Sequence, residues 1–319
     1  MKAFNLTTAS LLLSSTAALA QVETQTVTFQ NEGATLMGTL YLPEGHDGSP
    51  LPTVVVTGAW TTVEEQMPST YAHAMVERGF AAFTFDFRGW GKSGDLAENV
   101  RFVESPEAKT SDIRAAFEFL TTVPVVDQNR ISGLGICASA GYMVDAVSGN
   151  DLVKSIGLVA PWLQNEELVN AVYGGEESVQ GLIEVGRQAA EMGGQIIPAA
   201  GDVGQEGVLM PFGGYYFDEE RGAIHAYDNQ WNNAGWEGWL TYYPADNPGR
   251  LDKPLAIVHS ESAMIPDGVR SFLSGFTGDA TLQMLEDVTQ FDFYDNPEDV
   301  QRAADTIAAH FSAEATKDS

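Results

Sequence analysis

The sequence lacks several features that would assign a chain to a class at once. Its 319 residues include one cysteine, Cys137, so no internal disulfide can form. Lysine and arginine number 16 against 44 aspartates and glutamates, a formal charge of −28. Such a field repels phosphate backbones and anionic lipid surfaces, so we expect no nucleic-acid partner. Solvation alone is enough to explain the acidity.

Signals for metals, cofactors and membrane spans are also missing. The five histidines are scattered, and no group of His, Cys, Asp and Glu has metal-ligand spacing. The letters Gly89-x-Gly91-x-x-Gly94 match a dinucleotide motif, but they lie inside a turn-rich segment. No apolar stretch is long enough to span a membrane. We therefore expect no metal, no cofactor and no membrane span.

The amino terminus has the pattern of a secretory signal peptide. Met1-Lys2 precedes an apolar run at residues 11–13, and Ala18-Leu19-Ala20 resembles a cleavage site. We expect residues 1–20 to be the signal peptide and the mature chain to span residues 21–319. The protein is then exported, periplasmic or extracellular, from a bacterium. A lone thiol kept in such an oxidising compartment suggests a chemical role.

Hydrophobic patterning predicts alternating strands and helices. Strands are expected at residues 22–29, 35–41, 51–58, 80–85, 130–136, 155–160, 255–259 and 281–285, and helices at 64–78, 111–120, 139–147, 267–276 and 298–311. The first two strands form a hairpin around Gly33. Thr110 or Ser111 is expected to cap the second helix. Such alternation builds a mostly parallel sheet flanked by helices, with binding sites beyond the carboxyl ends of the strands.

A long insertion interrupts this rhythm at about residues 162–250. Residues 166–192 have helical spacing, residues 193–214 are rich in glycine, and residues 215–243 are crowded with aromatic side chains. We expect a cap folded over the strand ends. Trp231, Trp236 and Trp239 then either enclose an apolar pocket or pack the cap onto the main domain.

The stretch Gly133–Gly141 has the pattern of a strand, a sharp turn and a new helix. The pentapeptide Gly135-Ile136-Cys137-Ala138-Ser139 matches the G-x-S-x-G nucleophile elbow, with cysteine in the serine place and Ser139 in the second glycine place. Small residues are needed there because the elbow brings two backbones close together. The alternative is that Cys137 is a buried cysteine that only packs.

Four segments together resemble the α/β-hydrolase superfamily, and most closely its dienelactone-hydrolase-related branch, whose nucleophile can be cysteine. They are residues 57–66, 86–93, 135–141 and 289–295. The resemblance covers nearly all of the mature chain. It implies an α/β-hydrolase fold with a cap insertion.

The resemblance also implies site residues in the order nucleophile, acid, histidine. Cys137 matches the nucleophile. Ala263 falls where the acid is expected, so Glu261 is the nearest carboxylate, and Gln290 falls where the histidine is expected. Glutamine cannot take a proton and at best orients a water molecule. His259 ends a strand at the active face and is the best candidate base, unless it only braces the strand end.

Backbone groups are expected to form the oxyanion hole. One N–H comes from Ala138, after the nucleophile, and one from the Trp60–Thr61 region, after the first parallel strand. Trp60 may instead shape the pocket wall. The start of the helix after Cys137 is expected to favour a thiolate.

Two functions of different classes remain open. The first is an exported hydrolase of a carboxylic ester, lactone or thioester, in which Cys137 attacks a small, apolar acyl substrate. The second is a binding protein for an apolar ligand on an impaired hydrolase scaffold. Acyl transfer differs from hydrolysis only in the acceptor that attacks the acyl-enzyme, and the sequence does not separate the two. The sequence does not indicate an oligomeric state.

Overall fold

The computed structural model describes residues 22–93 and 100–317. The expected signal peptide lies outside the described residues. Within them, no helix is both long and apolar enough to cross a membrane.

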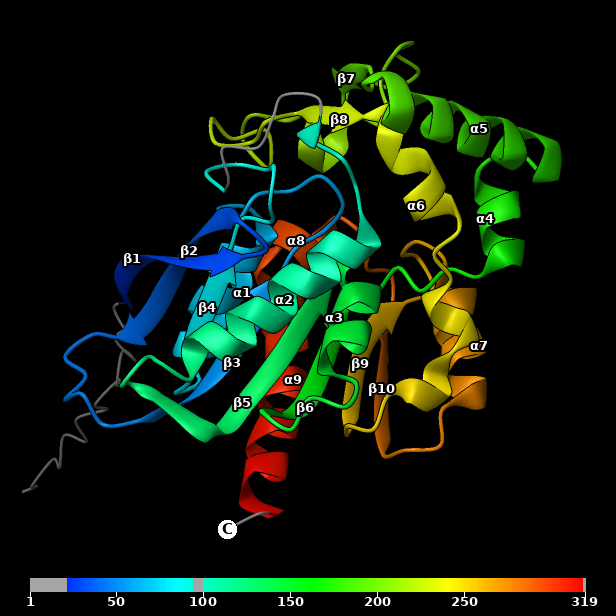
Figure 1. Ribbon diagram of the computed structural model, residues 1–319. Helices are drawn as coiled ribbons and strands as arrows, with labels where there is room; N and C mark the ends of the chain where they lie inside the picture. The colour runs from blue at the N-terminus through cyan, green and yellow to red at the C-terminus, as the bar shows by residue number, and fades with distance from the viewer. Residues whose placement is uncertain (1–21, 94–99, 318–319) are drawn as a thin grey trace, which may run out of the picture.

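A single eight-stranded sheet forms the centre of the molecule, in the order β1-β2-β4-β3-β5-β6-β9-β10 (Figure 1). The strands are β1 (Val22–Asn31), β2 (Ala34–Pro43), β3 (Leu51–Thr57), β4 (Ala81–Phe85), β5 (Val126–Ile136), β6 (Val153–Val159), β9 (Leu255–Ser260) and β10 (Ala280–Leu285). The expected amino-terminal hairpin is present, with Val22 opposite Pro43. β2 also pairs antiparallel with β4, and every later pairing in this sheet is parallel.

Helices cover both faces of the sheet, as the sequence predicts (Figure 1). α2 (Pro106–Leu120) and α3 (Ser139–Val147) lie on one face, and α1 (Met67–Val76) and α9 (Pro297–Lys317) lie on the other. α7 (Pro266–Gly275) connects β9 to β10, and α8 (Asp292–Asp295) follows β10.

The start of α2 corrects a prediction from the sequence. The helix begins at Pro106, five residues before the expected start at residue 111. Ser105 is its cap, because its side chain accepts a hydrogen bond from the Ala108 N–H at 3.2 Å. A proline at the first helical position loses no hydrogen bond there, so Ser-Pro is a strong start signal. Thr110 and Ser111 lie inside the helix.

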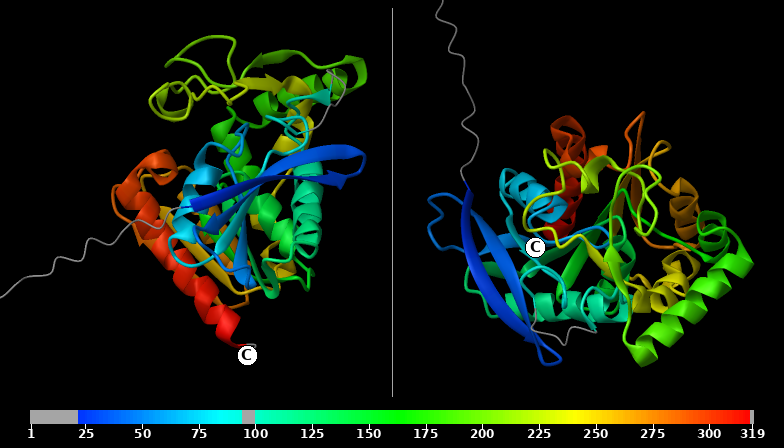
Figure 2. Two further views of the ribbon diagram at one scale, coloured as in Figure 1. Left: turned by 90° about the vertical axis from the view of Figure 1, so that its left-hand side faces the viewer. Right: turned by 90° about the horizontal axis from the view of Figure 1, so that it is seen from above.

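The segment between β6 and β9 forms the cap region. It contains α4 (Glu166–Val172), α5 (Glu176–Met192), β7 (Ile196–Pro198), β8 (Gln230–Asn232) and α6 (Trp236–Leu240). The single helix expected over residues 166–192 is broken at Gly174 and Gly175, which have φ of 88° and 95°. Figure 2 shows this region above one end of the sheet from two further sides.

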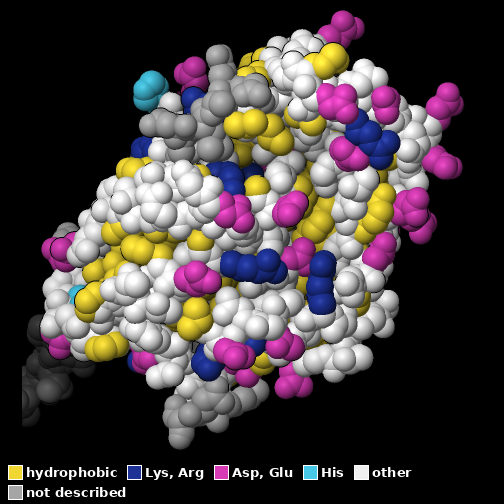
Figure 3. Space-filling model, viewed as in Figure 1, with side chains coloured by type: hydrophobic (Ala, Val, Ile, Leu, Met, Phe, Trp, Pro, Cys, Tyr) yellow, Lys and Arg dark blue, Asp and Glu magenta, His cyan; other side chains and the backbone are white. Residues whose placement is uncertain are grey.

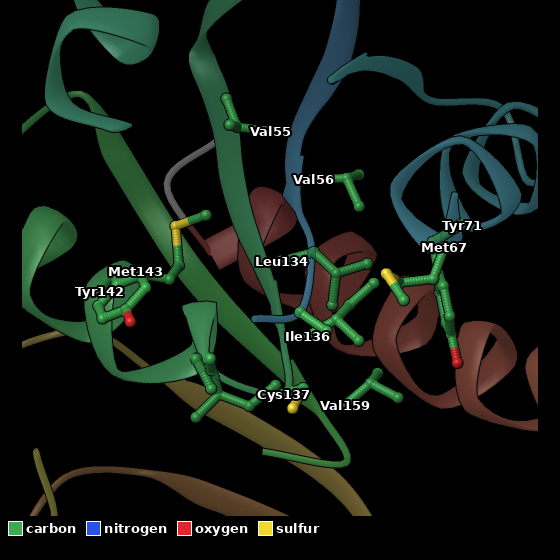
Figure 4. Close-up of a cluster of buried hydrophobic side chains, with 14 of the residues drawn as sticks. Val55, Val56, Met67, Tyr71, Leu134, Ile136, Cys137, Tyr142, Met143 and Val159 are labelled. Atoms are coloured by element: carbon green, nitrogen blue, oxygen red, sulfur yellow. The ribbon is translucent and has the colours of Figure 1, made fainter. Parts of the chain in front are cut away.

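The core lies where the parallel strands meet the helices on either face. Val54, Val55 and Val56 of β3 are fully buried, as are Leu134 and Ile136 of β5. Figure 4 shows Val55, Val56, Leu134 and Ile136 with Met143 and Tyr71 around them, and Cys137 at the end of β5. Acidic side chains are spread over the face drawn in Figure 3 and do not gather in one patch there.

Candidate active site

Cys137 lies at the sharp turn between β5 and α3, as the motif predicts. Its φ is 56°, in the left-handed region that a residue with a side chain rarely adopts. Hydrogen bonds hold it there: its N–H donates to the Val159 carbonyl at 3.1 Å, and its carbonyl accepts from the Trp162 N–H at 2.8 Å. Such strain is typical of functional sites and is kept only where the surroundings enforce it.

Small residues permit this turn. A Cβ on Gly135 would lie 2.8 Å from the Cα of Ala140, which shows how closely the strand and helix approach. Ser139, in the second glycine place of the motif, is a brace. Its Oγ accepts hydrogen bonds from the Ile136 N–H at 3.1 Å and from the Thr57 hydroxyl at 2.9 Å. The elbow is therefore rigid before any substrate arrives.

The sulfur of Cys137 is buried among hydrogen-bond donors. The residue is 6% exposed. Burial raises the pKa of its thiol above the usual value, and four groups oppose this change: the Tyr294 hydroxyl, the Ala138 and Trp60 N–H groups and the Gln290 amide. The expectation that the helix start alone favours a thiolate is thus too simple, because desolvation is the larger effect.

The two backbone donors lie where an oxyanion hole was expected. The N–H groups of Ala138 and Trp60 both reach the sulfur. Thr61 completes the loop with a φ of 64°, and its hydroxyl lies 3.0 Å from the Tyr227 hydroxyl of the cap region. The side chain of Trp60 also lines the cavity, so the two roles expected for Trp60 are compatible in position.

An apolar cavity of about 240 Å³ opens above Cys137. Trp60, Ala138, Met264 and Phe291 are among the lining residues from the main domain, and Trp162, Tyr173, Met210, Phe212, Tyr216, Trp236 and Trp239 are among those from the cap region. The sequence left open whether the tryptophans of the cap enclose a pocket or pack the cap onto the main domain, and the structure shows both arrangements. Trp236 and Trp239 line the cavity, whereas the fully buried Trp231 packs behind them.

Gln290 lies beside Cys137, in the place that the family resemblance gives to the histidine. It is 5% exposed and lines the cavity. Its Oε1 accepts from the Met264 N–H at 3.1 Å, and its Nε2 donates to the Ala160 carbonyl at 2.9 Å and to the Tyr294 hydroxyl at 3.0 Å. These bonds fix the amide in one orientation, so Gln290 is a rigid hydrogen-bonding group and not a base.

Tyr294 is the site residue that the sequence did not single out. It lies four residues after Gln290, in α8, and its hydroxyl forms a hydrogen bond with the sulfur of Cys137. Burial raises the pKa of Tyr294 well above its usual value, so the phenol stays protonated. The spacing of four residues from Gln290 was the only available signal, and it does not distinguish a site residue from a packing residue.

The architecture was compared with solved structures. The crystal structure of hypothetical protein PA2218 from Pseudomonas aeruginosa aligns with a TM-score of 0.79 and 24% identity, over 96% of this chain and 100% of that one. A complex of DcsB with a substrate analogue aligns with a TM-score of 0.76 and 15% identity, over 92% and 100%. Esterases and a monoglyceride lipase are further structural neighbours. The chain has the α/β-hydrolase fold.

Sequence comparison supports the same superfamily. Residues 11–162 of this hydrolase-fold chain match the family model "Esterase FrsA-like". PA2218 is 40% identical over 138 residues, which cover 43% of this chain and 36% of that protein. A thiohydrolase from Eupenicillium brefeldianum is 32% identical over 138 residues, covering 43% and 42%. The matched region thus spans about two fifths of the length of these relatives. These matches support a hydrolase.

His259 is not at the cavity. It lies in β9, is fully buried and does not line the pocket. Burial lowers the pKa of its imidazole to about 4, and a hydrogen bond with the Met264 backbone opposes part of this change. All five histidines of the chain are described, and none lines this cavity. The imidazole of the hydrolase fold is therefore missing from the wall around Cys137.

Glu261 is not at the cavity either. Its side chain is 62% exposed and pairs with Arg270 at the surface. The backbone N–H of Met264, next to Ala263, instead contacts residue 290. An exposed carboxylate bound to an arginine does not serve as the acid of a buried triad, because its charge is already compensated and solvated.

Three carboxylates meet below the oxyanion loop, which the spacing of the sequence did not indicate. Oxygen atoms of Glu64, Glu65 and Asp86 lie within 4.8 Å of one another. Each already has protein partners: the Thr84 hydroxyl for Glu64, Lys92 for Glu65, and the N–H groups of Glu64 and Lys92 for Asp86. Burial raises the pKa of Asp86 to about 7. The cluster anchors the loop that carries Trp60.

Proposed function

We propose that this chain is an exported hydrolase that cleaves carboxylic esters, lactones or thioesters through Cys137, and that thioesters of small, apolar acids suit the site best. The observation that carries the proposal is the position of the Cys137 sulfur. It lies on a strained elbow, touches two backbone N–H donors and faces an apolar cavity. The match to FrsA-like esterases and the similarity to a thiohydrolase support the same reaction class.

The reaction proceeds in two stages. The thiolate of Cys137 attacks the carbonyl carbon, and the Ala138 and Trp60 N–H groups stabilise the negative oxygen that forms. The intermediate collapses, the bond to the leaving group breaks, and the acyl group remains on the sulfur. Water then attacks this thioester, the carbon–sulfur bond breaks, and the acid leaves with a proton released to solvent.

The missing imidazole favours a thioester over an alkyl ester. A leaving group with a high pKa needs a proton as it departs, and no histidine lines the cavity to give one. A thiolate, whose conjugate acid has a pKa of about 8.5, departs without a proton. The apolar wall provides binding for an acyl chain but few groups for a polar one.

The test is hydrolysis of short acyl thioesters by the purified protein without residues 1–20. We expect release of the acid, a mass increase of one acyl group on Cys137, and loss of both in Cys137→Ala. Activity retained by Cys137→Ala, or no acylation with any thioester or activated ester, would overturn the proposal.

One observation favours the second candidate, a binding protein. Every hydrogen-bonding atom of Gln290 is already occupied by the protein, and no imidazole is available to activate water. This function predicts retention of an apolar acid or ester at a defined stoichiometry with no acylation of Cys137. The same mass measurement therefore separates the two functions.

A further inference from the structure

We propose that Tyr294 is a catalytic residue of this site, donating a hydrogen bond to the sulfur of Cys137 in place of the missing imidazole, and that Gln290 positions it. The inference rests on the proposed role of Cys137 as the nucleophile. It assigns functions to two residues for which the family pattern, with histidine at position 290, has no equivalent.

The direction of the hydrogen bonds follows from Gln290. Its Oε1 accepts from the Met264 N–H at 3.1 Å, so its Nε2 must face the other way. Nε2 then donates to the Ala160 carbonyl at 2.9 Å and to the oxygen of Tyr294 at 3.0 Å. An exchange of the two amide ends would set an NH₂ group against an N–H and an oxygen against a carbonyl, so only one orientation is compatible with these contacts.

The hydrogen of the Tyr294 hydroxyl is therefore free for the sulfur. The phenol oxygen accepts from Gln290 Nε2 at 3.0 Å, so its own hydrogen is left to donate, and the Tyr216 hydroxyl and the Cys137 sulfur are its other hydrogen-bond partners. A tyrosine has one hydrogen to donate. This hydrogen is assigned to the sulfur of Cys137, a hydrogen-bond partner of the hydroxyl.

This arrangement can stabilise a thiolate but cannot create one by accepting its proton. Tyr294 is fully buried and stays protonated, so it acts as a donor throughout the reaction. Desolvation opposes the charged sulfur, and a donor aimed at it offsets part of that cost. When the acyl group leaves, the electron pair of the broken carbon–sulfur bond returns to sulfur, and the same hydrogen bond stabilises the departing thiolate.

Gln290 is a positioning residue in this scheme. It holds the Tyr294 oxygen from one side while anchoring itself to two backbone groups on separate segments, at Ala160 and Met264. Residue 290 thus keeps the location of the family histidine but supports a neighbouring phenol. A merely structural glutamine would affect stability without changing the acidity of the thiol.

The experiment measures the pH dependence of alkylation of Cys137 by iodoacetamide in the full mature chain. Cys137 is the only cysteine, so the signal has one source. In Tyr294→Phe, we expect the apparent pKa of the thiol to rise by about one unit, with alkylation below that pKa about tenfold slower, because a hydrogen bond to a charged group is lost. In Gln290→Leu, we expect a smaller shift in the same direction.

Tyr71→Phe is the matched control. Tyr71 is also fully buried, and its hydroxyl donates to the Phe293 carbonyl at 2.8 Å, one residue before Tyr294. We expect its removal to lower stability and leave the pH profile of alkylation unchanged. A shift as large as that of Tyr294→Phe would show that general loosening is the cause and would overturn the proposal.

An unchanged pH profile in a folded Tyr294→Phe protein would also overturn the proposal. If Tyr294→Phe does not fold, the measurement on Gln290→Leu tests the proposal. An unchanged pH profile of alkylation in Gln290→Leu would contradict the role of Tyr294 and Gln290. Alkylation needs no substrate. The proposal can therefore fail while hydrolysis that depends on Cys137 stands, and the hydrolase can fail while the thiol still responds to Tyr294.

Discussion

The backbone N–H of Met264 donates to the Oε1 of Gln290 at 3.1 Å. In a triad of the hydrolase fold, an acid on this loop orients the histidine. Here the acid place holds Ala263, and the neighbouring peptide group orients the residue in the histidine place. The loop that carries Ala263 thus remains in contact with Gln290, although neither residue can titrate.

This relationship predicts that a triad can be rebuilt. In Gln290→His combined with Ala263→Asp, we expect the acyl-enzyme to be hydrolysed faster, within the range of about 10²–10⁴ typical of general-base catalysis. Gln290→His alone should gain less, because nothing would fix its tautomer. The measurement is the lifetime of acylated Cys137 by mass spectrometry. A folded double variant with an unchanged lifetime would show that deacylation is not limited by the missing base.

His259 is predicted to affect acid stability and not catalysis. Its pKa falls from 6.5 to about 4 on folding because of burial, so the unfolded chain binds the extra proton between these values. Stability should therefore be complete above pH 6.5 and decrease as the pH falls through about 4, by roughly 3 kcal/mol. In His259→Leu, we expect this pH dependence to disappear, as measured by urea unfolding at several pH values.

The same variant tests the role expected for His259 from the sequence. The Met264 backbone is the hydrogen-bond partner that raises the pKa of the imidazole, so leucine gives up that one contact and none with the cavity. Activity should stay within about twofold of the parent protein. A loss of tenfold or more with intact folding would identify His259 as the base after all.

The tight turn predicts that Gly135 cannot be replaced by a residue with a side chain without a loss of stability. In Gly135→Ala, the new Cβ would meet the Cα of Ala140 at 2.8 Å. We expect a loss of about 1–3 kcal/mol in unfolding free energy and a displaced Cys137 with little activity. Gly181→Ala is the control, since nothing lies within 4 Å of the Cβ added there in α5. That change should be neutral or stabilising, and equal effects at both positions would contradict the argument.

Phe212 is predicted to contribute to substrate binding at the mouth of the cavity. It lines the pocket although its side chain is 55% exposed. In Phe212→Ser, we expect KM for an apolar thioester to rise about fivefold, which corresponds to about 1 kcal/mol of lost apolar contact, with little change in stability. Phe217→Ser is the matched control, at 47% exposure and away from the pocket lining. An equal change in KM for both variants would argue against a binding role for Phe212.

The sequence by itself determined the elements and the elbow. Alternation of apolar residues is a local property, so β3, β5 and β9 and most helices were predictable, and the small residues around Cys137 indicated the strained turn. The helix boundaries were predicted less well where the sequence offered two possible start or stop signals. Ser105-Pro106 started α2 earlier than Ser111, and Gly174-Gly175 divided one helical pattern in two.

Only the tertiary structure decided which side chains meet at the site. Tyr294 and Cys137 are 157 positions apart in the sequence, and they meet only because the fold brings α8 close to the turn after β5. The fold likewise leaves His259 buried away from the cavity and Glu261 paired at the surface, although the sequence made them the candidate base and acid. Apolar periodicity indicates which residues form a strand or a helix. The direction of its side chain and the cost of burying it arise only when distant segments pack together.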